Sequence, residues 1–167
     1  MQLDDAERGF TFQAEGHLDM RMDPSTGMTA AELLATTSEA ALADLLHAEG
    51  EVRNARRIAK AICAARDKAP LMTTGDLISA VLSTTGAEVV QGGTLHGFRA
   101  DLVRQVFQAI RVAVNDEMGN LERGLRASVK VLRAKGRLVL ITFQSGEDRV
   151  WKKVMGELGK KREERTP

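Results

Sequence analysis

Acidic and basic side chains alternate in the segment LDMRMD, which contains Asp19, Arg21 and Asp23. In an extended backbone, side chains two residues apart point to the same side, so these three would share one face. The carboxylates could accept a hydrogen bond or a proton, and the guanidinium could bind a phosphate group. The alternative is an ion-pair network that only holds the loop in place. Residue type alone favours that alternative by roughly two to one.

A second polar group follows the apolar run RLVLITF, residues 137–143. That run is continuous and contains β-branched residues, which is typical of a strand covered on both faces in a parallel sheet. Such sheets bind ligands beyond the carboxyl ends of their strands. The site candidates at this end are Gln144, Ser145, Glu147, Asp148 and Arg149. The alternative role is helix capping, with Ser145 ahead of two acidic residues in a first helical turn, and both roles are compatible.

A basic side is predicted on the helix within EVRNARRIAKAICAARDKA, formed by Arg53, Arg56, Arg57, Lys60 and Arg66, of which the first four are the candidates for RNA contacts. Lysine and arginine at this spacing suit contacts with nucleic-acid phosphates. The alternative is a solvated helix face, which is the more common case. The three histidines are scattered without ligand spacing, so no metal site is predicted. Cys63 lies in an apolar helical pattern, where we expect a buried thiol.

Most of the chain has helical spacing. Aromatic residues make up only 4% of it, whereas alanine, leucine and arginine are common, which favours helices. Apolar spacing with glycine, proline or hydroxyl residues at the ends predicts helices at 29–36, 39–48, 51–69, 74–84, 100–118, 119–133 and from residue 145 onward. The pair at 100–118 and 119–133 forms either two helices or one bent helix. Glycine-containing stretches predict loops at 1–28 and 87–98.

The fold class is therefore mainly α, with residues 137–143 as one convincing strand. A strand that is apolar on both faces needs hydrogen-bonded neighbours at its edges and helices above and below. We expect those neighbours outside this chain, because no other segment has the pattern of a central strand.

Lysine and arginine, 24 in all, nearly balance 23 aspartates and glutamates, so nucleic-acid binding would need a local basic patch. No apolar run approaches the roughly 18–20 residues of a membrane span, and no membrane partner is expected.

Four segments in order resemble the MraW/RsmH family: QLDDAERGFTF, GHLDMRMD, FQAIRVAVNDE and GRLVLITFQSGEDR. Members of that family are S-adenosylmethionine-dependent methyltransferases that modify the exocyclic amine of a cytosine in small-subunit ribosomal RNA. The resemblance covers nearly the whole chain. It implies methylation of that RNA with S-adenosylmethionine as cofactor.

The family fold implies a Rossmann-like methyltransferase core with a helical insertion. Residues 1–24 would be the loop leaving the core, 25–105 the helical substrate-recognition insertion, and 106–167 the returning part of the core. Residues 137–143 would be the fifth core strand. The family's glycine-rich cofactor loop and its ribose-binding acidic residue have no counterpart here, so we expect the core to be incomplete. A protein segment supplying the missing core strands is an expected partner, and this chain alone is expected to be inactive.

For the site, the resemblance implies that Gln2 contacts the cofactor. The two polar groups at Asp19–Asp23 and Gln144–Arg149 become substrate-site candidates. Two positions depart from the family pattern at the strand end, with Gln144 in place of histidine and Gly146 in place of leucine. Arg104 and Gln105 replace a threonine and an arginine, which puts a substrate contact there in doubt. The segment Asn115–Glu117 matches the family, and its simplest role is to end one helix and start another.

Two alternatives to an enzyme remain open. The first is a non-catalytic RNA-binding factor in small ribosomal subunit assembly, which the changes at Gln144 and Gly146 favour modestly. The second is a helical domain whose strand pairs with a partner protein. The expected location is the mitochondrial matrix, or the cytoplasm if the protein is bacterial.

Overall fold

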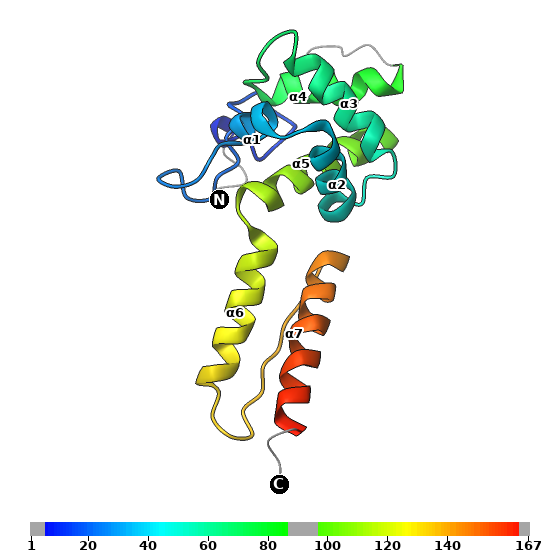
Figure 1. Ribbon diagram of the computed structural model, residues 1–167. Coiled ribbons are helices and arrows are strands. Elements are labelled where there is room, and N and C mark those ends of the chain that lie inside the picture. Colours follow the sequence, from blue (N-terminus) through cyan, green and yellow to red (C-terminus); the bar gives the residue numbers. More distant parts are fainter. Residues whose placement is uncertain (1–5, 87–96, 164–167) are drawn as a thin grey trace. The chain divides into compact units, whose positions relative to one another are not determined.

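The computed structural model describes residues 6–86 and 97–163, and the chain divides into two compact units, Met1–Asn115 and Asp116–Pro167. Figure 1 shows the helices of both units. The first unit contains η2 (Ala6–Arg8), α1 (Ala30–Thr36), α2 (Glu39–Gly50), α3 (Ala55–Arg66), α4 (Thr74–Leu82), η3 (Ser83–Thr85) and α5 (Phe98–Val114). The second contains α6 (Glu117–Val131) and α7 (Ser145–Glu163). The prediction of a mainly helical chain is confirmed for the described residues.

Hydroxyl residues begin several of these helices, as their positions in the sequence predict. Thr29 accepts a hydrogen bond from the Glu32 N–H, and the Glu32 carboxylate accepts one from the Thr29 N–H, which is a complete capping box for α1. Thr73 and Asp76 form the same arrangement at α4. The break between α5 and α6 falls at Asp116, whose φ of 46° is left-handed. Residues 100–131 therefore form two helices and not one bent helix.

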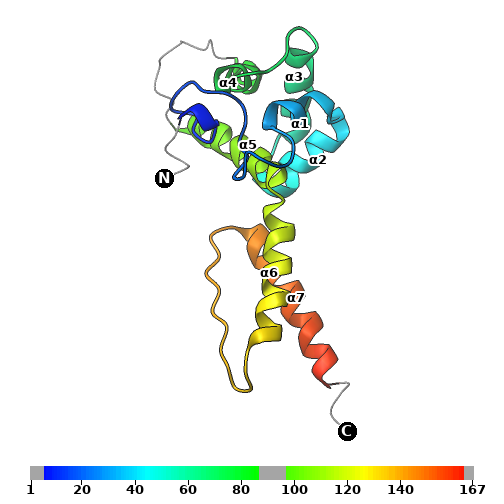
Figure 2. The same ribbon diagram turned by 90° about the vertical axis from the view of Figure 1, so that its left-hand side faces the viewer.

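The core of the first unit lies between α2, α3 and α5 (Figures 1 and 2). Each helix buries an apolar stripe at helical spacing, as Leu42 and Leu46 of α2 illustrate. The side chains of Ile58 and Ile62 do the same on α3, at 1% and 0% exposure. Burial of one such side chain is worth about 1.5–3 kcal/mol, so this stripe packing is the main stabilising contribution in the unit.

The N-terminal loop packs onto this helical core and belongs to it. Leu18 and Met20 are both fully buried in the core cluster. The Leu18 N–H donates to the Met72 carbonyl at 2.9 Å, and the Thr74 N–H donates to the Gly16 carbonyl at 2.9 Å. On the other side, the Ala31 N–H donates to the Leu18 carbonyl at 2.9 Å. The loop is therefore fixed between the starts of α1 and α4 (Figure 2).

In the second unit, α6 and α7 run in the same direction. Arg126 pairs with Glu157 at 2.5 Å, and four residues earlier on each helix Glu122 pairs with Lys153 at 3.3 Å. This constant offset is possible only for parallel helices in register. Between them, Leu125 and Val154 are buried.

Within the part of the chain that the structure describes, no helix is both long and apolar enough for a membrane span.

Residues 137–143 connect the two helices as an extended segment, which is not a paired strand among the described residues. The segment has no partner strand among the described residues, and one of its faces is bare. Leu138, Leu140 and Thr142 are half-buried, whereas Val139, Ile141 and Phe143 are 82%, 74% and 89% exposed. Backbone pairing needs an adjacent strand, which the described residues do not offer. The apolar run is therefore covered on one face instead of two.

Candidate functional site

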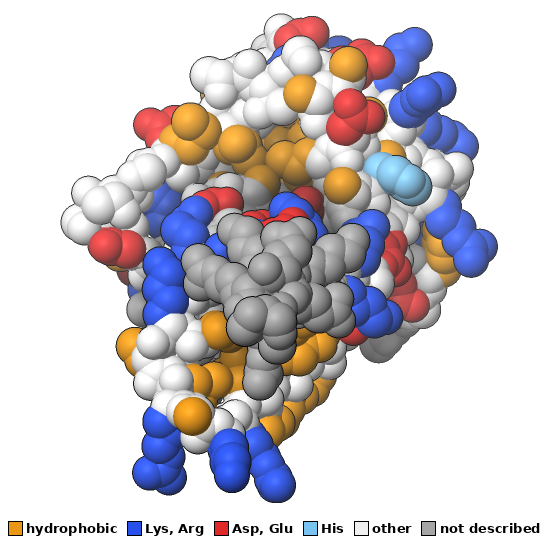
Figure 3. All heavy atoms as spheres, turned by 60° about the horizontal axis from the view of Figure 1, so that its bottom comes forward, with side chains coloured by type: hydrophobic (Ala, Val, Ile, Leu, Met, Phe, Trp, Pro, Cys, Tyr) orange, Lys and Arg blue, Asp and Glu red, His pale blue; other side chains and the backbone are white. Residues whose placement is uncertain are grey.

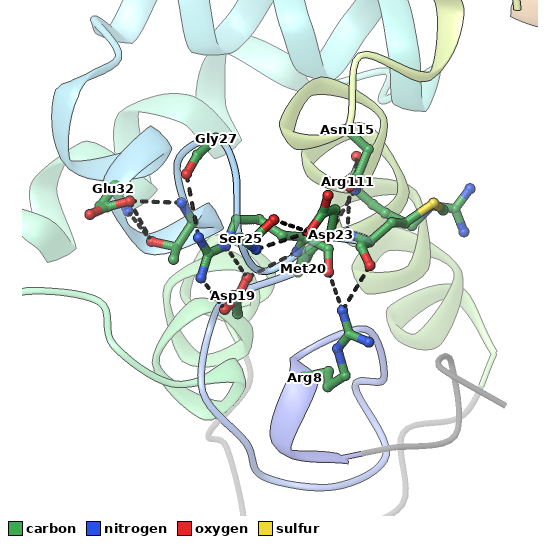
Figure 4. A network of polar contacts seen from close by, with 12 residues as sticks. Arg8, Asp19, Met20, Asp23, Ser25, Gly27, Glu32, Arg111 and Asn115 are labelled. Atoms are coloured by element: carbon green, nitrogen blue, oxygen red, sulfur yellow. Dashed lines mark hydrogen bonds and ion pairs between the residues drawn. The ribbon is translucent and has the colours of Figure 1, made fainter. Parts of the chain in front are cut away.

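The loop Met20–Met22 is held by two side chains that approach it from different elements (Figure 4). The Asn115 side chain, at the end of α5, donates to the Met20 carbonyl and accepts from the Met22 N–H, both at 2.7 Å. Arg8 of η2 donates to the Arg21 carbonyl at 2.5 Å and to the Met22 carbonyl at 3.1 Å. The Met20 N–H donates to the Arg8 carbonyl at 3.0 Å.

These contacts stabilise an unusual backbone conformation at Met20. Its φ is 61°, in the left-handed region, and its side chain is fully buried. A residue other than glycine is strained there by about 1–3 kcal/mol, so surrounding contacts must hold it. Neither Arg8 nor Asn115 was singled out as a site residue from the sequence. The available signals were their places in the segments QLDDAERGFTF and FQAIRVAVNDE.

Asp19 and Arg21 form a bidentate pair on this loop. The Arg21 Nε and NH2 groups donate to the two Asp19 carboxylate oxygens, each at 2.8 Å. The Arg21 side chain is 20% exposed and the Asp19 side chain 28% exposed, so both remain accessible from solvent. Hydrogen bonding from Arg21 lowers the pKa of Asp19, and Asp19 raises the pKa of Arg21. A carboxylate held ionised in this way suits hydrogen-bond acceptance better than proton abstraction.

Asp23 forms a separate turn. Its carboxylate accepts from the Ser25 N–H at 3.0 Å and from the Ser25 hydroxyl at 2.6 Å, and this hydrogen bonding lowers its pKa. The structure therefore brings Asp19 and Arg21 together and directs Asp23 to its own turn (Figure 4). The ion-pair network proposed as an alternative from the sequence is present. The substrate role of the three residues stays a prediction.

The second polar group lies at the start of α7, within the second unit. The Glu147 carboxylate accepts from the Phe143 N–H at 2.8 Å and from the Gln144 N–H at 3.3 Å, so the expected capping is performed by Glu147. Asp148 pairs with Lys152 at 2.6 Å along the same helix. The remaining members, Ser145 and Arg149, lie in the first turns of α7. All of these contacts lie within the second unit.

A small cavity opens beside this helix start. It has a volume of about 150 Å³ and is lined by Glu117, Met118, Leu121, Leu140, Ile141, Thr142 and Glu147. A site for a drug-sized cofactor typically needs about 300–1,000 Å³. The cavity is thus too small for S-adenosylmethionine, and Gln2, the cofactor contact implied by the family resemblance, lies outside the described residues.

Gly146 adjoins the cavity residue Met118. A methyl group added at Gly146 would lie 3.4 Å from the Met118 Cε atom, in ordinary contact. A longer side chain, such as the leucine of the family pattern, would have to displace the Met118 thioether. Met118 therefore lies beside the position at which this chain has glycine in place of the family's leucine.

The four predicted RNA-backbone cations are exposed on α3 and the turn before it: Arg53, Arg56, Arg57 and Lys60. Among the described residues, none of the four makes an ion pair with a carboxylate, so their charge is directed to solvent. Arg66 on the same helix differs, because it donates to the carbonyls of Leu34 and Thr37 and so fixes the end of α1. Figure 3 shows lysine and arginine side chains, in blue, standing out from the surface in several groups.

Metal binding and thiol chemistry have little support in the described residues. No group of three or more histidine, cysteine, aspartate or glutamate side chains there could hold a metal ion. His17 forms an isolated backbone bridge with Thr73 and so contributes to the fold of the loop. Burial raises the pKa of the Cys63 thiol, which disfavours the reactive thiolate.

Comparison with known proteins places the chain in a family. The model of the MraW methylase family matches residues 1–167. Three relatives named ribosomal RNA small subunit methyltransferase H come from Methylobacterium sp. (strain 4-46), Marinomonas sp. (strain MWYL1) and Methylococcus capsulatus, and are 47%, 46% and 46% identical to the chain. The alignments cover 91%, 92% and 97% of this chain but 43%, 47% and 51% of the relatives. The chain thus spans about half the length of these relatives, and the resemblance inferred from its motifs is confirmed: the chain belongs to the MraW methylase family.

Proposed function

We propose that this chain is part of a methyltransferase that transfers a methyl group from S-adenosylmethionine to the exocyclic amine of a cytosine in small-subunit ribosomal RNA. The family match over the whole chain carries this proposal. The names of the relatives support ribosomal RNA as the substrate. The accessible Asp19–Arg21 pair on a tightly held loop supplies a hydrogen-bond acceptor and a cation, which suits an amine and a phosphate of the RNA.

The remaining part of the core is proposed to come from another protein segment. The exposed side chains of Val139, Ile141 and Phe143 form a bare apolar face on an extended segment whose backbone has no strand partner among the described residues. Adjacent strands with covering helices would satisfy both the backbone and this face. Since the cavity beside the start of α7 is too small for the cofactor, the chain by itself is expected to be inactive.

Reconstitution tests the proposed activity. The chain is mixed with the segment of the Methylobacterium relative that it does not match, with labelled S-adenosylmethionine and a small-subunit ribosomal RNA fragment. Methyl transfer is expected from the mixture and from neither part alone. Transfer by the chain alone would contradict the incomplete core, and an inactive mixture would contradict the proposed reaction.

A second candidate function is a non-catalytic factor that binds RNA during small-subunit assembly. The observation favouring it is Gly146, which stands where the family pattern has leucine and where an added Cβ would already contact the Met118 side chain at 3.4 Å. Firm RNA binding by the chain together with an inactive mixture would support this candidate over the enzyme.

The cellular location, mitochondrial matrix or bacterial cytoplasm, also stays a prediction, which fractionation of cells producing the chain would test.

The basic side of α3 is proposed to contact RNA phosphates. If Arg56 and Arg57 each neutralise one phosphate, the Arg56→Gln, Arg57→Gln variant should bind more weakly. The slope of log affinity against log salt concentration should fall by about 1.4 for single-stranded RNA. Fluorescence anisotropy with a labelled RNA fragment across a salt series measures both quantities.

The matched control removes two exposed cations from the second unit, in the variant Arg133→Gln, Lys135→Gln. Both variants have the same net charge, so a difference between their salt slopes reports position and not total charge. Equal slopes in the two variants would show that α3 is only a solvated helix face.

A further inference from the structure

We propose that Asn115 is a positioning residue, which orients the Asp19–Arg21 pair towards the RNA by fixing the backbone of Met20–Met22. This inference rests on the proposed function and adds the residue that sets the geometry of the pair. Asn115 acts through the backbone and not by touching substrate. Arg8 supports the same backbone from the opposite side (Figure 4).

The hydrogen bonds of this backbone show why two distant residues control it. Residues 20–22 contain six backbone N–H and carbonyl groups, and all six have partners. One group, the Arg21 N–H, bonds to Asp19 within the loop. The other five bond to Arg8 or to Asn115. The backbone from which the Arg21 side chain extends therefore depends on contacts made 13 residues upstream and 95 residues downstream of the loop. The guanidinium itself is held by Asp19 and by the Gly27 carbonyl.

An asparagine amide is specifically suited to this contact. Its oxygen accepts from the Met22 N–H while its nitrogen donates to the Met20 carbonyl, both at 2.7 Å. The same nitrogen donates to the Arg111 carbonyl at 2.9 Å, so Asn115 is itself anchored to α5. Aspartate has nearly the same shape but cannot donate when ionised, and it would place a negative charge against two carbonyl oxygens.

A merely structural role predicts a different outcome from a positioning role. If Asn115 only ends α5, its replacement lowers stability and affects every function of the first unit alike. If Asn115 positions Arg21, its effect on catalysis must pass through Arg21. Replacing Arg21 first should then remove most of the further effect of replacing Asn115, which a double-mutant cycle measures.

The test uses the reconstituted mixture with the variants Asn115→Asp, Arg21→Ala and the two combined. Asn115→Asp is expected to lower kcat at least about tenfold, because a misplaced group loses the reactive geometry. The KM for RNA should stay within about threefold, because exposed cations supply most of the binding. The double variant should be no more than about twofold slower than Arg21→Ala alone.

Asn120→Asp is the matched control, since Asn120 is exposed and accepts from Arg123, where a carboxylate is tolerated. It should leave kcat within about twofold of the unchanged protein. The positioning role would be overturned if the losses of kcat in the two single variants multiply in the double variant. It would also be overturned if Asn115→Asp lowers kcat only in proportion to the folded protein that is lost. If Arg21→Ala is fully active, the pair does not face the substrate, and both this inference and the proposed role of the pair fail. If Arg21→Ala is inactive but Asn115→Asp is not, only this inference fails.

Discussion

At the scale of single residues, the site is determined by hydrogen bonds around one loop. Asp19 is ionised beside Arg21, and Gly9 lies against the backbone of His17, which brings η2 and Arg8 close to the loop. Asp19 and Arg21 were identified from their alternation in the sequence. The structure shows Asp19 and Arg21 paired with each other across Met20, whereas Asp23 bonds to Ser25.

The Asp19–Arg21 pair should make stability depend on pH. The pKa of Asp19 is lower in the folded protein than in the unfolded chain, so the pair stabilises the folded state above about pH 4. That contribution is lost as the pH falls through the lowered folded pKa. Asp19→Asn should therefore lower Tm by roughly 2–5 °C at pH 7 and by less at pH 3, measured by calorimetry.

The control for this prediction is Asp101→Asn. Asp101 pairs with Arg104, but their side chains are 63% and 59% exposed, so solvent screens the pair. Its replacement should change Tm little at either pH. A Tm difference for Asp19→Asn that is constant from pH 7 to pH 3 would show that the pair does not contribute through ionisation.

Gly9 should tolerate no side chain. Its φ is 71°, and a Cβ atom would collide with the His17 carbonyl oxygen and lie 3.1 Å from the Asp19 nitrogen. Gly27 has a similar φ of 73° but open space around it. Gly27→Ala should cost about 1–2 kcal/mol of unfolding free energy from the backbone conformation alone, and Gly9→Ala clearly more. Urea unfolding followed by circular dichroism compares the two, and equal costs would contradict the close approach.

At the scale of elements, the extended segment 137–143 has two unequal faces. Its pattern of β-branched and apolar residues identified an extended backbone from the sequence alone. The covering of both faces stays a prediction, because the partners were expected outside this chain; the described residues cover only the face of Leu138, Leu140 and Thr142. The bare face reflects the absence of strand partners among the described residues.

A lysine placed at either of two adjacent positions on this segment should have different effects on the stability of the chain. Val139→Lys should change the unfolding free energy of the chain by no more than about 0.5 kcal/mol, because Val139 is 82% exposed. It should abolish activity in the reconstituted mixture, where that face is proposed to become buried. Leu140→Lys should instead destabilise the chain itself, since Leu140 is half-buried and lines the cavity. Full activity of Val139→Lys in the mixture would exclude this face as the joining surface.

At the scale of the whole molecule, the two units differ in how much apolar surface they bury. The large core cluster lies entirely within the first unit. In the second unit, the fully described residues contribute only Leu125 and Val154 to the buried hydrophobic set. Local stability follows buried apolar contacts, so the second unit should open more readily.

Hydrogen exchange should show this difference directly. Amides of α2, α3 and α5 should exchange at least about tenfold more slowly than those of α6 and α7, because a difference of 1.4 kcal/mol in opening free energy gives that factor. Adding the complementing segment should slow exchange in α6 and α7 and leave α2 and α3 nearly unchanged. Equal protection in both units without that segment would contradict the difference in core size.

The sequence by itself determined the helices, their caps and the family, because each depends on local spacing or on ordered motifs. It also named Asp19 and Arg21, whose substrate role stays a prediction. Helical stripes and capping boxes involve residues three or four positions apart, so they can be recognised without a structure. Only the tertiary structure identified Arg8 and Asn115 as the residues that hold the loop. Their hydrogen bonds reach backbone groups 13 and 95 residues away, and no periodicity records such contacts. The tertiary structure likewise decided which face of residues 137–143 is covered, since coverage depends on the elements that pack beside a strand.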